Sequence, residues 1–213
     1  MATGTRLEPD STVMARPRNT RPPSDAVEEP VGEEASGRHR WLVLVYRVPS
    51  EPTRLRATVW RRLRSLGAVY LQNSVATLPA GPAAERAMRK LRHEIIEMGG
   101  TAVLMESEAL VGEADVRSAF QAARHDEYEE IVDRCQDFLA QVEKEHVAEH
   151  FSFAELEENE VDLVKLQNWF EKVRARDTFG SPGRAEAEQA LARCAVALEG
   201  YASKVYEVET DAH

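Results

Sequence analysis

Between residues 41 and 110, the apolar positions switch repeatedly between the spacing of strands and the spacing of helices. Residues 41–46 form an unbroken apolar and aromatic run that ends before Pro49, which predicts a buried central strand. Over residues 52–66 the apolar positions then recur every three or four residues. This spacing predicts an amphipathic helix, for which Gly67 is the expected stop.

The same alternation continues after this helix. Residues 68–79 predict two short strands joined by a turn at Asn73-Ser74, and residues 82–98 predict a second helix that ends before Gly99-Gly100. A last strand is expected over residues 101–110. The resulting order, β-α-β-β-α-β, is typical of a ferredoxin-like fold, with two helices on one face of a four-stranded antiparallel sheet. The opposite face must be covered by another element or used for binding.

From residue 115 onward the pattern is helical throughout. One helix is expected over residues 115–149, and a second follows Ser152, whose hydroxyl forms a capping box with Glu155. After the turn at residues 180–183, a third helix repeats its apolar positions every seven residues. We therefore expect an antiparallel bundle of about three helices, or a hairpin able to form oligomers, and an α+β class for the whole chain.

Three parts follow from these patterns: a disordered tail over residues 1–38, a ferredoxin-like domain over 39–112, and a helical bundle over 113–210. No apolar run reaches the length of a membrane span, and the first residues lack the apolar stretch of a signal peptide. The two cysteines, Cys135 and Cys194, lie on apolar helix stripes and are interpreted as core thiols. We expect a cytoplasmic protein without membrane contact.

Charge is distributed unevenly along the chain. The formal net charge is −10, yet residues 41–105 contain ten Lys and Arg against four Asp and Glu, whereas residues 106–213 sum to −15. A local basic excess in an acidic protein creates a field that holds phosphate or another oxyanion. This distribution favours anion or nucleic-acid binding over catalysis.

The helix over residues 52–66 is the centre of the basic region. Arg56, Trp60 and Arg64 follow one another at a spacing of four residues and so form one ridge, in which the guanidinium fork suits an oxyanion and the indole offers a stacking face. The alternative is a solvated helix face whose arginines pair with the acidic bundle. The second helix extends the basic surface with Arg86, Arg89, Lys90, Arg92 and His93. The predicted anion- or DNA-binding residues are Arg47, Arg54, Arg56, Trp60, Arg61, Arg62 and Arg64.

A possible metal motif occurs near residue 150. His146, Glu149 and His150 match the H-x-x-E-H arrangement of one class of zinc peptidases. The match falls at a helix end in a Glu-rich stretch, and short motifs of this kind recur by chance. We therefore expect no metal and no cofactor, with these three residues as a weak alternative.

Several segments resemble the N-terminal domain of the chromate resistance protein ChrB. They are WLVLVYRVP, EPTRLRATVWRRLRSLGAVYLQNSVATLP, and the end of the second helix at Glu97-Met98-Gly99-Gly100. The resemblance is most specific from Trp41 to about Leu110 and looser to about residue 178. The run GAVYLQNSV is also similar to one in PaaX-like regulators. The chain looks like a short form that lacks the family's second domain and ends instead in a third heptad helix.

The resemblance implies a regulator associated with chromate resistance that senses chromate and acts on transcription. Together with the residues, it predicts a non-enzymatic protein that contacts DNA or a chromate-type oxyanion through the arginine-rich helix and forms a homo-oligomer through its C-terminal helices. Two alternatives remain open. One is an interaction module whose basic domain docks on acidic helices, and the other is a zinc-dependent hydrolase.

Overall fold

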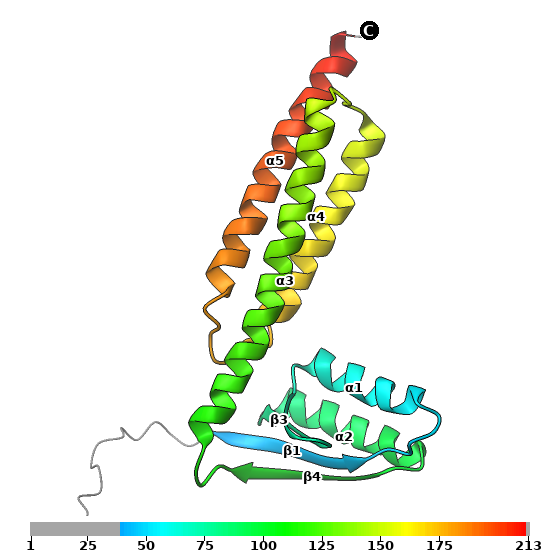
Figure 1. Cartoon of the computed structure of the whole chain (residues 1–213), viewed down its shortest axis with the longest axis vertical. Helices are drawn as coiled ribbons and strands as arrows, with labels where there is room; N and C mark the ends of the chain where they lie inside the picture. Colours follow the sequence, from blue (N-terminus) through cyan, green and yellow to red (C-terminus); the bar gives the residue numbers. More distant parts are fainter. Residues whose placement is uncertain (1–38, 212–213) are drawn as a thin grey trace, which may run out of the picture. The chain divides into compact units, whose positions relative to one another are not determined.

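The computed structural model describes residues 39–211, so the tail predicted over residues 1–38 lies outside the described part (Figure 1). Within residues 39–211, one four-stranded antiparallel sheet is accompanied by five helices, which confirms the mixed helix-and-strand class. In chain order the elements are β1 (Arg40–Arg47), α1 (Arg54–Leu66), β2 (Val69–Gln72), β3 (Val75–Pro79), α2 (Pro82–Glu97), β4 (Thr101–Glu108), α3 (Glu113–Val147), α4 (Phe153–Arg174) and α5 (Arg184–Asp211).

The sheet and helices α1 and α2 together are called the sheet module. β1 is one of the two central strands of its sheet. The strand order is β2-β3-β1-β4, and the register places Leu44 opposite Ala76 of β3 and Leu104 of β4. The prediction that this strand is buried was only partly correct, because Val45 is 40% exposed whereas Leu44 is fully buried. Side chains alternate between the two faces of a strand, and only one face of β1 is covered along its whole length.

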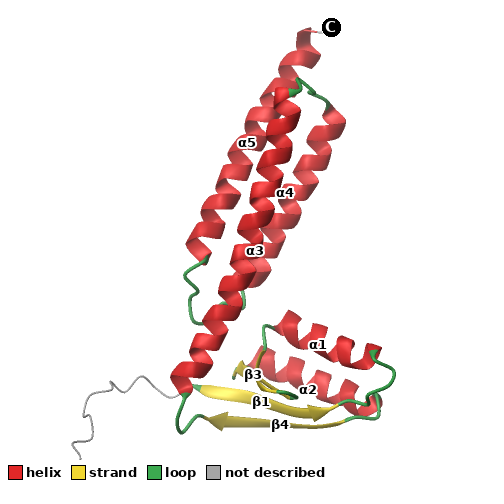
Figure 2. Ribbon diagram, in the orientation of Figure 1, coloured by secondary structure: helices red, strands yellow, loops and turns green. Residues whose placement is uncertain are grey.

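Helices α1 and α2 both lie on the covered face of the sheet (Figure 2). Their apolar stripes reach the strands through Val59 and Leu63 on α1 and Met88 on α2, all fully buried. Because Leu42 and Leu44 of β1 belong to the same core, the sheet and the two helices are held by one apolar layer. This layer fixes the position of α1 relative to the ends of β1 and β2.

The opposite face of the sheet is covered only at the start of β1. The Trp41 indole stacks on Phe120 of α3, with ring centroids 5.6 Å apart, and lies 5.7 Å from Phe179 in the α4–α5 connection. Further along this face, Val103 and Met105 of β4 are 57% and 45% exposed. The apolar core of the sheet module thus includes side chains from beyond residue 112.

Helices α3, α4 and α5 share a second apolar core. The Ser152 hydroxyl accepts a hydrogen bond from the Glu155 backbone N–H at 3.3 Å, so the predicted N-terminal cap of α4 is present. No helix in residues 39–211 is long and apolar enough to cross a membrane. Buried side chains of this core include Tyr128, Ile131, Phe138, Leu163, Phe170, Val173, Leu198, Tyr201 and Val205.

Candidate functional site

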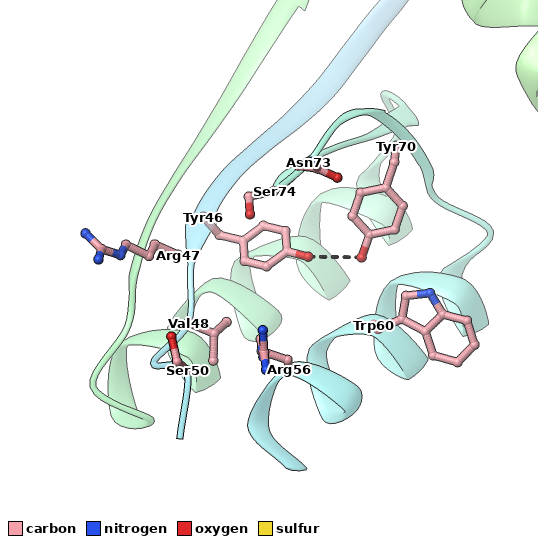
Figure 3. A pocket seen from close by; sticks show the side chains of 9 residues that line it. All are labelled: Tyr46, Arg47, Val48, Ser50, Arg56, Trp60, Tyr70, Asn73 and Ser74. Atoms are coloured by element: carbon pink, nitrogen blue, oxygen red, sulfur yellow. Dashed lines mark hydrogen bonds between the residues drawn. The ribbon is translucent and has the colours of Figure 1, made fainter. Parts of the chain in front are cut away.

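A hollow of about 560 Å³ opens where β1 ends, between the β2–β3 turn and the first half of α1 (Figure 3). Its lining combines polar and apolar surface and contains two arginines, two tyrosines and an exposed indole. The lining residues are Tyr46, Arg47, Val48, Ser50, Arg56, Trp60, Tyr70, Asn73 and Ser74.

The strand register places two tyrosines side by side in this hollow. Tyr46 lies two residues after Leu44 and four after Leu42, so its side chain points to the same, helix-covered face of the sheet. Tyr70 of β2 pairs with Ala76 on that face. The backbone N–H of Tyr46 donates to the Ser74 carbonyl at 2.9 Å, which fixes the β2–β3 turn beside it. The two phenolic oxygens lie 3.0 Å apart and form a hydrogen bond.

This tyrosine pair is a hydrogen-bond donor. Burial raises the pKa of Tyr70, and the hydrogen bond with Tyr46 raises it further. One hydroxyl hydrogen is used between the rings, and the other remains available to a ligand. Tyr70 therefore keeps its proton, and the pair offers one hydrogen to an anion.

Arg56 supplies the cation on the helix side of the pocket. It lies one helical turn before Trp60, and both side chains are exposed towards the hollow. Within residues 39–211 the Arg56 guanidinium has no ion-pair partner. Arg47 also lines the hollow, although Figure 3 shows its guanidinium directed away from the two tyrosines. The pocket thus combines an available guanidinium with hydroxyl donors.

The remaining α1 arginines lie outside the hollow. Arg62 forms an ion pair with Glu94 of α2 at 3.4 Å, and the guanidinium carbon of Arg64 lies 5.5 Å from the centre of the Trp60 ring. Arg54 and Arg61 are exposed on the outer face of the helix. The seven predicted binding residues therefore divide into three that line the pocket and four that do not.

Three of the five basic residues of α2 have local partners. Arg89 pairs with Glu85 at 2.6 Å, His93 with Glu97 at 3.2 Å, and the Arg92 Nε donates to the Ala102 carbonyl at 3.1 Å. These contacts lie within the sheet module. They place this group of basic residues away from the pocket lining.

The three residues of the H-x-x-E-H match do not share a helical face. Helix α3 ends at Val147, Glu149 adopts a left-handed backbone with φ 54°, and the His150 carbonyl accepts the Tyr201 hydroxyl at 2.6 Å. The His146 ring packs edge-on against Phe151. Among the residues that the structure describes, no group of three His, Cys, Asp or Glu side chains is placed to hold a metal ion.

The pocket contains six residues that our sequence reasoning did not select. The GAVYLQNSV run, which is similar to one in PaaX-like regulators, contains three of them: Tyr70, Asn73 and Ser74. This similarity could have identified them as binding residues. Tyr46 precedes the predicted Arg47 by one residue and was treated only as part of a strand. Val48 and Ser50 had no distinguishing sequence signal.

The fold and the pocket together describe a mixed α/β protein with a cationic, hydroxyl-lined hollow at one end of its sheet. The chain belongs to the family described as Protein ChrB, N-terminal, whose model matches residues 56–212. The sequence had suggested that the third long helix is a departure from the family. The match extends through α5, so this helix is part of the family pattern. A comparison with curated protein sequences finds no match. Membership in this family implies a role related to chromate resistance.

Proposed function

We propose that the protein is a non-enzymatic, cytoplasmic regulator of the response to chromate or related oxyanions, which it binds in the pocket between β1, the β2–β3 turn and α1. The observation that supports this proposal is the meeting of Arg56 with the Tyr46 and Tyr70 hydroxyls in one hollow. The β-α-β-β-α-β order supports a ferredoxin-like identity for this module, and α3–α5 serve as its helical bundle.

A tetrahedral dianion suits these donors. The planar guanidinium of Arg56 presents two parallel N–H groups to a pair of oxygens, and charge-assisted hydrogen bonds of this kind are about twice as strong as neutral ones. The tyrosine pair donates a further hydrogen bond from a group that stays neutral. A volume of about 560 Å³ exceeds that of one tetrahedral anion, so the anion keeps some of its water.

Contact with DNA would use the outer face of α1. Arg54 and Arg61 are exposed there, and Arg64 is exposed beside Trp60. Phosphate contacts by such residues release counterions, so affinity for DNA falls as salt increases. In this proposal the pocket senses the anion, the outer arginines contact phosphate, and helices α3–α5 join copies of the chain.

Chromate binding to the purified chain, measured by equilibrium dialysis, tests the assignment of the pocket. Arg56→Gln should weaken binding roughly 10- to 100-fold, since a hydrogen bond to a charged group contributes about 1.5–3 kcal/mol. Arg54→Gln is the matched control, because the same substitution on the same helix changes a residue outside the pocket. Excess sulfate should compete, because it has the same shape and charge.

Two results would overturn this assignment: the absence of chromate binding by the unmodified chain, or equal losses in the two variants. DNA from its own upstream region, titrated at low and moderate salt, then tests the second contact. The double substitution Arg61→Glu with Arg64→Glu should abolish salt-dependent DNA binding while chromate still binds.

The second candidate function is a protein interaction module. It is favoured by the exposed apolar side chains of Val45, Val103 and Met105 on the uncovered face of the sheet. It predicts a stable oligomer by light scattering together with no response to chromate or DNA. That combination of results would place the interaction module first.

A further inference from the structure

The only two cysteines of the chain lie against each other in the helical core. Cys135 is on α3 and Cys194 is on α5, and both are free and fully buried. The Cys194 thiol donates a hydrogen bond to the Cys135 backbone carbonyl, with 3.5 Å between Sγ and the oxygen. Two residues 59 positions apart on different helices thus lie in direct contact.

We infer that Cys135 and Cys194 form a reversible disulfide site, which a small peroxide oxidises and a thiol reductant restores. This inference concerns the helical core and is independent of the pocket described above. The close approach of the Cys194 sulfur to Cys135 is its main support, because a disulfide requires two cysteines that lie near each other without movement of the backbone.

The two thiols have different roles. The interaction between them lowers the pKa of Cys135 and raises the pKa of Cys194, and the Cys194 thiol keeps its hydrogen, which it donates to the Cys135 backbone carbonyl. The Cys135 thiolate attacks one peroxide oxygen, the O–O bond breaks, and the second oxygen leaves as hydroxide, which takes up a proton. The Cys194 sulfur then attacks the resulting sulfenic acid, the S–S bond forms, and water leaves with the Cys194 proton. The pair loses two electrons and two hydrogens, and hydrogen peroxide becomes two molecules of water.

Two surface hollows approach this pair along the contact between α3 and α5. One, of about 310 Å³, is lined by Val132 and Gln136, and the other, of about 530 Å³, is lined by Leu139 and Ala197. These residues lie within about one helical turn of a cysteine on either side. Neither cysteine lines these hollows, so a small peroxide reaches the sulfur atoms through a local opening of the helices.

The bond would join α3 covalently to α5, and the loop that it closes would contain the whole of α4. Closing a loop of about 60 residues restricts the unfolded chain, so oxidation should raise Tm by roughly 8–16 °C. The alternative is that the two thiols are sealed packing residues with no redox chemistry. The two possibilities differ in what peroxide does to the folded protein.

Peptide mapping of the full chain after treatment with hydrogen peroxide tests the inference. Trypsin cleaves after Arg134 and Arg193, so each cysteine begins its own peptide, residues 135–144 and 194–204. After alkylation of free thiols in denaturant, we expect a cross-linked pair of these peptides, lighter than their sum by two hydrogens. Dithiothreitol should restore both free peptides and remove the increase in Tm.

Cys194→Ala is the control, in which the cross-linked pair and the Tm shift should both be absent after the same treatment. If that variant does not fold, the map of the unmodified chain decides alone. The inference is overturned if both cysteines remain fully alkylated after peroxide. It is equally overturned if the products are only disulfides between chains or over-oxidised single thiols.

Discussion

Glu127→Gln should be among the most destabilising conservative substitutions in the chain, because Glu127 sits between two arginines in a buried position. Its carboxylate lies 2.8 Å from the Arg124 Nε, outside hydrogen-bonding angles, and it accepts a hydrogen bond from Arg176 at 2.8 Å. Arg124 is only 4% exposed and also donates to the carbonyl of Gly67, the residue that ends α1. The network therefore connects α3 with the helix that lines the pocket.

The size of the effect follows from burial. Burial lowers the pKa of Arg124, and the negative charge of Glu127 opposes this shift. Gln keeps the shape of the side chain and removes the charge, so the buried guanidinium of Arg124 loses the carboxylate that pairs with it. Breaking a buried ion pair in this way costs about 3–5 kcal/mol. For a chain of this length the corresponding fall in Tm is roughly 6–20 °C.

Urea unfolding followed by circular dichroism gives the free energy of unfolding for each variant. Glu129→Gln is the control, since Glu129 lies on the same helix and pairs with His125 at an exposed position, 3.5 Å away. Exposed pairs contribute about 0–1 kcal/mol. If Glu127→Gln costs no more than Glu129→Gln, the network has no structural role and the reasoning is refuted.

Three further outcomes are expected. Ser152→Ala should cost about 1 kcal/mol in urea unfolding because it removes the cap of α4, and an unchanged free energy would contradict the cap. Gly67→Ala should lower the free energy of unfolding more than Gly180→Ala in the same assay. Both residues have φ near +70° to +80°, but of the two only Gly67 has a side chain close to the position of an added Cβ, at 2.6 Å. Equal costs would show that this side chain moves aside freely. Burial and the Asp177 carboxylate raise the pKa of Tyr128 to about 12. The folded state therefore keeps a proton that the unfolded state loses from about pH 10. Because of this difference, stability should fall as pH rises from 10 to 12. Tyr128→Phe should flatten that decline in alkaline unfolding curves, and an unchanged slope would exclude this cause.

The helices and strands were predictable because Pro and Gly separate segments of different hydrophobic spacing. The helix predicted over residues 82–98 is observed as Pro82–Glu97, and the strand predicted over 101–110 as Thr101–Glu108. These boundaries depend on local backbone preferences, which a sequence displays directly. The error on β1 arose because a continuous apolar run does not reveal that one face stays uncovered at Val45.

The pocket was predictable only in part, because it depends on contacts between distant residues. The spacing of Arg56 and Trp60 on one helix identified one wall. The opposite wall requires the pairing of β1 with β3 and the register shift between Tyr70 and Gln72, which together bring Tyr70 to Tyr46. Nothing local marks a tyrosine as the partner of another 24 positions away.

The same limit applies to charge and changes how the arginine-rich helix should be tested. Five arginines of similar sequence context have different environments on α1: Arg56 faces the hollow, Arg62 is neutralised by Glu94, and Arg64 lies over Trp60. Reversing Arg61 and Arg64 together changes two residues outside the pocket lining, one of which lies beside the pocket residue Trp60. A count of positive charges along the helix does not distinguish these environments, because every guanidinium contributes the same charge to it. Single substitutions matched on one helix separate anion binding from phosphate contact, because each removes one guanidinium from one environment and leaves the other arginines in place.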